Sequence, residues 1–376
     1  MPSCDRRRYA DLTDCAEQVH PANVLACQTD NGFADWLAAS GGSLAVSTYQ
    51  AGKLLLVGWD GAQLQLLPRH FEKPMGLDVQ GDRLVLATRD AVTFFHNDAL
   101  LARSYLPDQP ARYDALYLPR TSYYTTDLNI HDLRLNPEGQ VWIVATRFSC
   151  LATLSHDYNF VPCWKPSFIS EFVPEDRCHL NGLALKDNQP AWVTALGETD
   201  HVAGWRDGKV HGGILMDVAS NEVILRGLAM PHSPRWHQDK LWVLNSGAGE
   251  LLQVDPSTGD SEIITILPAY LRGLCFSGDH ALIGMCKIRE TNIFGGMPVQ
   301  EKFDTLKCGV AVVSLGSGEW IGTLEFTAGC TEIYDLRMLD GMRRPNILNL
   351  EKEAARQAVS APDFSYWLRR ENAIGD

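Results

Sequence analysis

The sequence predicts an all-β fold, a six-bladed β-propeller, and a repeat in the middle of the chain carries this prediction. Trp142, Trp192 and Trp242 are spaced at intervals of 50 residues. In each copy a histidine stands at the start of a short apolar strand, a polar turn follows, and the tryptophan lies in the next strand. A period of about 40–50 residues with several short strands per copy is typical of propeller blades.

Composition is consistent with one closed, well-packed domain. The 376 residues are 45% hydrophobic and 21% charged, which allows a large core. The net charge of −13 argues against nucleic acid as a partner, because no basic stripe is present to neutralise phosphates. The ten cysteines are scattered, without a C-x-x-C pair, as expected for reduced thiols. No apolar segment follows the basic N-terminus and no apolar run reaches membrane-spanning length, so we predict a cytoplasmic protein without membrane contact.

The strands are predicted in order along the chain. Residues 1–32 form an N-terminal arm, residues 33–350 the propeller and residues 351–376 a helical C-terminal tail. The first unit contains strands at 43–49, 53–59 and 63–67, with Asp60-Gly61 as a hairpin turn. The second contains strands at 75–79, 83–89 and 92–95. Residues 103–128 are a tyrosine-rich insertion without clear strands, which we expect to act as a lid.

The later units complete a ring. The third unit begins at Asn129, the fourth at His179, the fifth at His232 and the sixth at Leu271. The sixth carries a second insertion at residues 288–306. Residues 332–339 repeat the pattern of residues 129–135 and have no complete blade after them, so we expect this strand to complete the first blade and remove the sheet edge. Seven blades would result if residues 332–350 formed a blade of their own.

Candidate site residues follow from the geometry of a propeller. The entrance to each first strand and the loop between the second and third strands open on the same face, so their side chains converge on a concave mouth. Candidate catalytic residues in these positions are Glu198, His201, Tyr334 and Arg272. Candidate substrate-binding residues are Tyr49, Gln50, Arg89, Arg147, Asn181 and Asn245. Two alternatives remain for Arg89, Arg147 and Arg272: they bind an anionic substrate, or they pair with Asp78, Asp132 and Glu290.

His131, His179 and His232 occupy equivalent entrances in three consecutive units, which predicts a metal site. Imidazole nitrogens favour zinc, iron or copper over calcium, and three histidines leave positions open for water and substrate. Asp132, Glu198 or Asp335 would orient a ligand imidazole. In the competing interpretation, the histidines form hydrogen bonds between blades.

The pattern therefore predicts a metal-dependent enzyme, hydrolytic or oxidative, that acts on a small molecule or peptide. The alternative is a non-catalytic propeller module that binds a peptide or a carbohydrate at the same mouth.

Short motifs resemble a known propeller family. Asn181-Gly182-Leu183-Ala184, eleven residues before Trp192, resembles a strand of the gluconolactonase, regucalcin and senescence-marker family. His131-Asp132 falls where that family has Asn-Asp, and His232 falls near a family aspartate. Those proteins are six-bladed propellers that hold a divalent metal with Asn, Asp and Glu, and many open lactones. Histidine at two of the three metal positions means that the resemblance implies the fold rather than calcium or lactonase chemistry.

The chain from Phe33 to about Leu350 more closely resembles a family of bacterial conserved hypothetical propeller proteins without an assigned function. The shared phrases are Ser47-Thr48-Tyr49-Gln50-Ala51-Gly52-Lys53, Asn129-Ile130-His131-Asp132, His179-Leu180-Asn181-Gly182 and Met230-Pro231-His232-Ser233-Pro234-Arg235. This resemblance implies a propeller without indicating a reaction.

Overall fold

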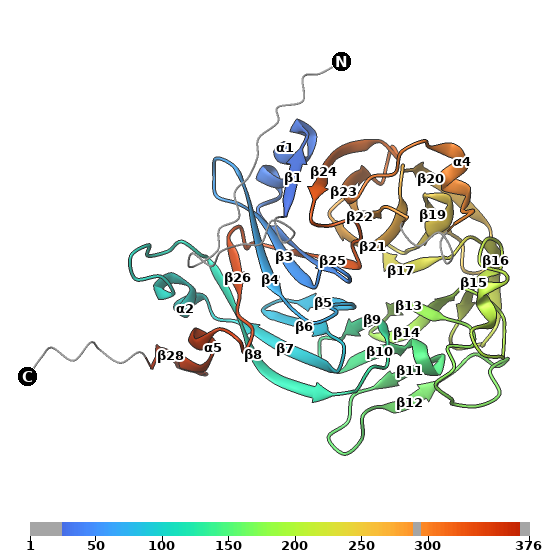
Figure 1. Cartoon of the computed structure of the whole chain (residues 1–376), viewed down its shortest axis with the longest axis horizontal. Helices are drawn as coiled ribbons and strands as arrows, with labels where there is room; N and C mark the ends of the chain where they lie inside the picture. Colours follow the sequence, from blue (N-terminus) through green and yellow to red (C-terminus); the bar gives the residue numbers. More distant parts are fainter. Residues whose placement is uncertain (1–24, 289–294, 369–376) are drawn as a thin grey trace, which may run out of the picture.

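Six antiparallel sheets surround a central axis in the computed structural model, which describes residues 25–288 and 295–368 (Figure 1). From the axis outward, blade 1 contains β25 (Asp335–Leu339), β2 (Ser43–Thr48), β3 (Lys53–Trp59) and β4 (Leu64–His70). Blade 2 contains β5 (Leu77–Gln80), β6 (Arg83–Ala87), β7 (Ala91–Asn97) and β8 (Ala115–Tyr124), with β26 (Pro345–Ile347) parallel to β8. Blade 3 contains β9 (Ile130–Leu135), β10 (Val141–Ala145), β11 (Cys150–Thr153) and β12 (Val161–Trp164).

The other three blades have the same four-strand plan. Blade 4 contains β13 (Leu180–Lys186), β14 (Gln189–Ala195), β15 (Gly213–Asp217) and β16 (Val223–Leu228). Blade 5 contains β17 (His232–His237), β18 (Lys240–Asn245), β19 (Glu250–Val254) and β20 (Ser261–Ile266). Blade 6 contains β21 (Tyr270–Ser277), β22 (His280–Cys286), β23 (Gly309–Ser314) and β24 (Trp320–Ala328). The predicted all-β propeller with six blades is confirmed.

Both ends of the chain contribute to closing the ring. The innermost strands β25, β5, β9, β13, β17 and β21 contact one another in a closed circle. Strand β25, near the C-terminus, pairs with β2 and completes blade 1, as the repeat predicted. Strand β1 (Ala26–Thr29), near the N-terminus, pairs with β24 at the outer edge of blade 6. The pairing covers strand edges that would otherwise present unpaired backbone groups.

Local signals explain where the first elements begin and end. Helix α1 (Asn31–Ser40) begins after Asp30, whose carboxylate accepts a hydrogen bond from the Phe33 N–H at 2.8 Å, and ends at Gly41 with φ 72°. The arm was expected to extend to residue 32, but residues 26–29 form a strand and the helix crosses that boundary. The Asp60-Gly61 turn joins β3 to β4 as predicted, with Gly61 at φ 104°. Residues 1–24 lie outside the described part of the chain.

The prediction that the tyrosine-rich segment lacks strands was wrong. Helix α2 (Ala99–Ser104) is followed by a loop and then by β8, the outer strand of blade 2. Tyr113 and Tyr117 are buried, and Tyr117 is fully inaccessible. The alternation of apolar and polar residues expected of a strand was hard to recognise in β8. This strand is paired on both edges, with β7 and β26, and its first half is buried.

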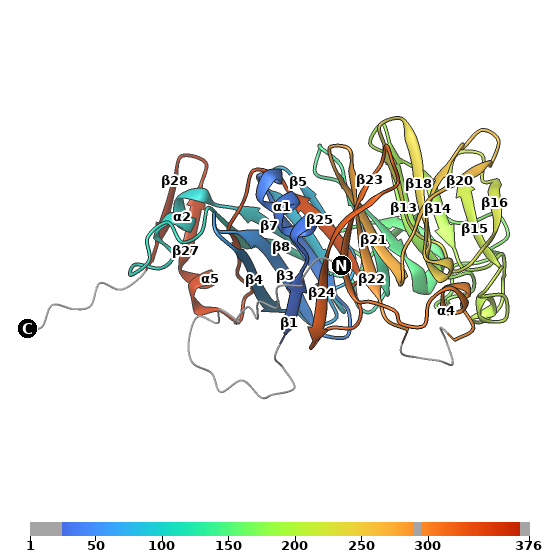
Figure 2. The same ribbon diagram turned by 90° about the horizontal axis from the view of Figure 1, so that it is seen from above.

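The C-terminal tail is only partly helical. Helix α5 (Glu353–Gln357) leads into a hairpin of β27 (Ala358–Ala361) and β28 (Phe364–Trp367), which lies at the side of the disc next to α2 (Figure 2). The second insertion contains α4 (Pro298–Lys302), while Glu290 and its neighbours 289–294 lie outside the described residues. No described helix is long and apolar enough to cross a membrane.

A cluster of buried charges lies among the innermost strands. Arg337 of β25 donates at 2.7 Å to Asp78 of β5 and to Asp335, and Arg235 of β17 donates at 2.7 Å to Asp132 of β9. Nearby charges lower the pKa of the Asp78 carboxyl despite its burial, Arg134 and Arg337 being the main contributors. These pairs link four of the six blades across the axis.

Candidate functional site

A cavity of about 240 Å³ opens beside the innermost strands, and its lining combines three histidines with an arginine and a tyrosine. The lining residues include Tyr49, Gln50, Asn129, His131, Asp176, His179, Trp205, Arg206, His232, Arg272, Glu332 and Tyr334. They come from the entrances of blades 3 to 6 and from loops of blades 1 and 4. The volume suits a small molecule, since it lies below the usual range of about 300–1,000 Å³ for drug-sized ligands.

The local backbone fixes how two of the histidines face the cavity. His131 Nδ1 lies 2.9 Å from the Asn129 carbonyl oxygen, and His232 Nδ1 lies 3.0 Å from the Met230 carbonyl oxygen. Asn129 and Met230 have φ of 56° and 48°, in the left-handed region that side chains rarely adopt. In both blades, therefore, a strained residue presents its own carbonyl group to the histidine two positions later. Because a carbonyl oxygen only accepts, Nδ1 carries the proton in both rings.

His179 is oriented differently, by a carboxylate. Its Nδ1 lies 2.8 Å and 2.9 Å from the two carboxylate oxygens of Asp176, and the Trp205 indole N–H donates to the same carboxylate at 3.2 Å. His179 itself has φ 51° and Asp176 also has φ 51°. Strain of this kind costs of order 1–3 kcal/mol per residue and is found at functional sites.

The most informative contact joins His131 Nε2 to His179 Nε2 at 3.1 Å. Both rings already carry a proton on Nδ1, so two neutral rings would place two lone pairs against each other. The two rings can form a hydrogen bond to each other at this distance only when one additional proton lies between the two Nε2 atoms. Burial, and then the neighbouring His179 and Arg272, hold the pKa of His131 well below its usual range, which makes His131 the acceptor.

An arginine and a tyrosine also line the cavity, and the Tyr334 ring meets the His131 ring edge-on at 5.6 Å. The Arg272 guanidinium lies 3.9 Å from the centre of the Tyr334 ring and pairs with Glu332 at 2.6 Å. Among the described residues, the Arg272 Nε and Tyr334 hydroxyl groups are buried without a hydrogen-bond partner. At the rim, Arg206 lies over the Trp205 ring at 5.3 Å. Buried polar groups without partners call for an explanation, and in a cavity wall a bound ligand supplies one.

Three comparisons relate the chain to known proteins. Residues 31–348 match the model of a domain of unknown function, DUF4915. The chain belongs to this family. No curated protein gives a significant match.

Solved structures similar to this DUF4915 chain include the following three. A nidogen/laminin complex is 10% identical with a TM-score of 0.48, covering 80% of this chain and 99% of that one. A protein of unknown function from Bacteroides caccae is 8% identical with a TM-score of 0.49, and the match covers 79% of this chain and 98% of that one. Virginiamycin B lyase from Staphylococcus aureus is 10% identical with a TM-score of 0.41, and the match covers 84% of this chain and 99% of that one.

Seven of the residues named from the sequence line the cavity of this DUF4915 chain: Tyr49, Gln50, His131, His179, His232, Arg272 and Tyr334. The three histidines share one wall, but the described residues contain no group of three or more His, Cys, Asp or Glu side chains that could hold a metal ion. Only His131 and His179 are in direct contact.

The other six named residues do not line the cavity. Arg89 pairs with Glu72 at 2.5 Å, Arg147 with Asp127 at 3.4 Å, and Glu198 with Arg226 at 3.1 Å. His201 is exposed on the surface.

Asn181 and Asn245 hold the backbone of a neighbouring segment. The Asn181 amide donates to the Pro231 carbonyl oxygen, and the Asn245 amide oxygen accepts from the Ala229 N–H. Both link the end of one blade to the next, which explains an asparagine at those positions without a ligand.

The residue that orients a histidine also differs from the three expected. Asp132 pairs with Arg235 and Asp335 with Arg337 in the buried cluster, and Glu198 is at the surface. Asp176 has this role instead. It lies in an irregular loop three residues before His179, and only the Asp-x-x-His spacing could have indicated it.

The buried histidines make a testable contribution to pH-dependent stability. Burial holds the pKa of both His131 and His232 well below 6.5 in the folded protein, so the unfolded chain binds more protons below that pH. Their stabilising contribution is complete above pH 6.5 and is lost as the pH falls. We expect His232→Gln to reduce the slope of unfolding free energy between pH 6.5 and 5 by up to about 1.4 kcal/mol per pH unit. Urea denaturation at several pH values measures this slope.

The matched control is His237→Gln, because His237 lies outside the cavity and stacks on Phe276. The slope should fall less in this control than in His232→Gln. An unchanged slope in His232→Gln would contradict the prediction.

Proposed function

We propose that the cavity is the active site of an enzyme that acts on a small anionic molecule by general acid–base catalysis. The observation that supports this most directly is the Asp176–His179–His131 chain, in which the Nε2 atoms of two imidazoles lie 3.1 Å apart and Asp176 contacts Nδ1 of His179 at 2.8 Å. A proton held at this position can be donated to a substrate and recovered, with the Asp176 carboxylate balancing the charge on His179.

The arginines support the substrate class. Arg272 and Arg206 bring two positive charges to the wall and rim, and only Arg272 has a carboxylate partner among the described residues. Negative charge that develops on a substrate oxygen would be stabilised by Arg272 and the Tyr334 hydroxyl. Burial raises the pKa of Tyr334, which keeps its hydroxyl protonated as a hydrogen-bond donor.

The test is a substrate screen that detects proton transfer without knowing the reaction. Small keto acids, hydroxy acids and carboxylate-bearing lactones are incubated with the protein in D₂O, and proton NMR follows both bond cleavage and C–H exchange. At least one carboxylate substrate should react faster with wild type than with His131→Gln. Equal rates for wild type and His131→Gln would reject the assignment.

A metal-dependent reaction is a second candidate, and a specific observation favours it. All three histidines direct Nδ1 to an oxygen acceptor, which leaves Nε2 available, as in most metal-binding histidines. Two nitrogen ligands on one zinc ion at tetrahedral geometry are about 3.3 Å apart, close to the 3.1 Å between His131 and His179. An ion would replace the shared proton, and His232 would have to move to become the third ligand.

Metal analysis separates the two candidates. Protein purified without chelator or histidine tag and equilibrated with Zn²⁺ or Co²⁺ at neutral pH is expected to bind near-stoichiometric metal if the second candidate holds. His179→Ala should lose the ion and His237→Ala should retain it. Absence of bound metal in wild type would eliminate this candidate and leave acid–base catalysis standing.

A further inference from the structure

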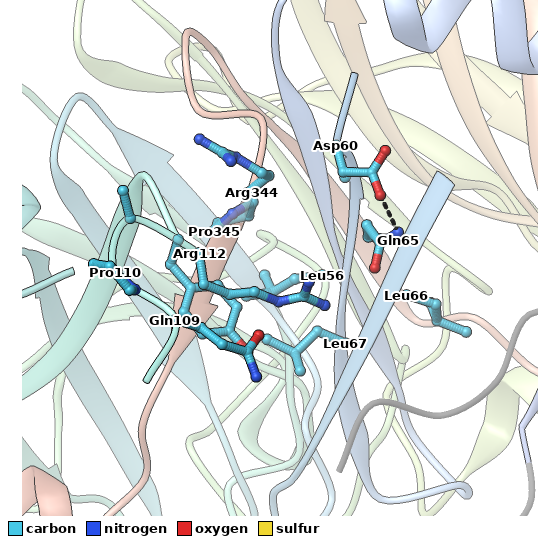
Figure 3. Close-up of a pocket in the computed structure, with 13 residues that line it drawn as sticks. Leu56, Asp60, Gln65, Leu66, Leu67, Gln109, Pro110, Arg112, Arg344 and Pro345 are labelled. Carbon is cyan, nitrogen blue, oxygen red and sulfur yellow. Dashed lines mark hydrogen bonds between the residues drawn. The ribbon is translucent and has the colours of Figure 1, made fainter. Parts of the chain in front are cut away.

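A second cavity of about 270 Å³ lies between the outer strands of blade 1 and the loop that joins α2 to β8 (Figure 3). It shares no lining residue with the cavity of the histidines. Leu56 of β3 and Leu67 of β4 are buried and form an apolar floor, and Pro110 and Pro345 add to it. The cavity therefore has an apolar surface and is separate from the cavity of the histidines.

Arg112 is a charged group of this cavity that has no ion-pair partner among the described residues. Its side chain extends from the loop into the pocket on the side of Leu56 and Leu67 (Figure 3). The side chain is half-buried, and among the described residues no carboxylate lies within ion-pair distance of it. Arg344, in contrast, has Asp114 at 4.0 Å. An unpaired guanidinium beside apolar surface is unusual in a chain with a net charge of −13.

Asp60, the carboxylate among the described lining residues, already accepts hydrogen bonds from nearby residues of its own hairpin. It accepts hydrogen bonds from the Ala62 and Gln63 N–H groups at 2.9 Å and from the Gln65 amide at 2.6 Å (Figure 3). Asp60 therefore stabilises its own turn rather than neutralising the arginine.

The backbone holds Arg112 in place. Ala111 has φ 59°, in the left-handed region, and its N–H donates to the Arg103 carbonyl oxygen at 2.8 Å. Such a conformation costs roughly 1–2 kcal/mol for a residue with a side chain, and surrounding contacts must maintain it. The Arg112 N–H closes the turn onto the Gln109 carbonyl oxygen at 3.2 Å. The turn thus fixes the backbone from which the Arg112 side chain extends.

We propose that this cavity binds a small organic carboxylate with an aliphatic body. The carboxylate would form a two-pronged hydrogen bond with the Arg112 guanidinium, and the aliphatic part would lie on Leu56 and Leu67. The Gln109 side chain lines the same space and adds a donor. This site is independent of the proposed catalytic function.

Hexanoate is the probe, and calorimetric titration at constant ionic strength is the measurement. Hexanoate should bind to wild type, and neutral hexanamide of the same size should not. Arg112→Gln should weaken hexanoate binding at least tenfold, since a charge-assisted bond contributes about 1.5–3 kcal/mol. Arg226→Gln, a surface control on blade 4, should bind like wild type. Thermal unfolding of each variant verifies that it is folded.

Three results would overturn the proposal. Equal binding of hexanamide would mean that the guanidinium is not used, and equal binding of inorganic phosphate would mean that the apolar floor is not used. Loss of binding in Arg206→Gln with retention in Arg112→Gln would place hexanoate in the histidine cavity instead.

Discussion

Replacement of Arg337 by methionine is expected to lower the free energy of unfolding by about 3–5 kcal/mol. The guanidinium donates at 2.7 Å to both Asp78 and Asp335, and all three side chains are buried. Methionine fills much of the volume of the arginine side chain but carries no charge. The negative charge of Asp78 would then be balanced only by Arg134 at 3.5 Å, and that of Asp335 by Arg235 at 3.6 Å. Urea denaturation at neutral pH measures the loss.

The loss should depend on pH in a defined direction. Burial already raises the pKa of Asp335 in the folded protein, so the folded state binds a proton more readily than the unfolded chain. Removing Arg337 increases this difference, and the variant should therefore lose less stability at pH 5 than at pH 8.

Two further variants of the network provide controls. Arg226→Met removes an exposed arginine from its pair with Glu198 and should change stability by no more than about 0.5 kcal/mol. Adding Asp335→Asn to Arg337→Met should restore part of the loss, because one uncompensated charge is removed. A loss below about 1 kcal/mol for Arg337→Met would contradict a charge network that holds the blades together.

Replacement of Asp176 by asparagine is expected to lower kcat by about 10²–10⁴ with a much smaller change in KM, once a substrate from the screen is available. The amide oxygen of the introduced asparagine can still accept from His179 Nδ1, but the neutral amide cannot balance the charge on a doubly protonated ring. Asp176 is therefore a positioning residue that acts through His179, which contacts it at 2.8 Å.

The pH profile distinguishes this role from a merely structural one. Without the carboxylate, the pH profile of kcat should shift relative to the wild-type profile. Asp176→Glu should recover part of the rate. Glu171→Gln, in the same loop between blades 3 and 4 but exposed, is the matched control. An unshifted profile in Asp176→Asn would contradict the proposed proton chain.

The sequence predicted the parts of the site that repeat with the blades. His131, His179 and His232 precede by 11, 13 and 10 residues the tryptophans that recur every 50 residues, and the propeller places all three in the lining of one cavity. Arg272 and Tyr334 followed from the same reasoning about strand entrances. Periodic positions are predictable because every blade repeats the same backbone path.

Residues in irregular segments escaped this reasoning. Asp176 and Trp205 come from irregular loops, Asp176 with left-handed backbone and Trp205 in a single 3-10 turn. Arg89 and Arg147 sit at repeat-equivalent positions, yet each finds a carboxylate at the surface. Sequence period determines where a Cα atom lies in a blade, but the nearest opposite charge determines where a long side chain points.

Completion of blade 1 by β25 has a consequence for biosynthesis. The innermost strand of the first blade is among the last propeller strands to leave the ribosome, since β25 spans Asp335–Leu339. Until then, β2 exposes an open edge suited to pairing with other nascent chains. A fragment that stops before residue 335 would therefore be expected to aggregate, because its N-terminal sheet has no partner to pair with at the axis.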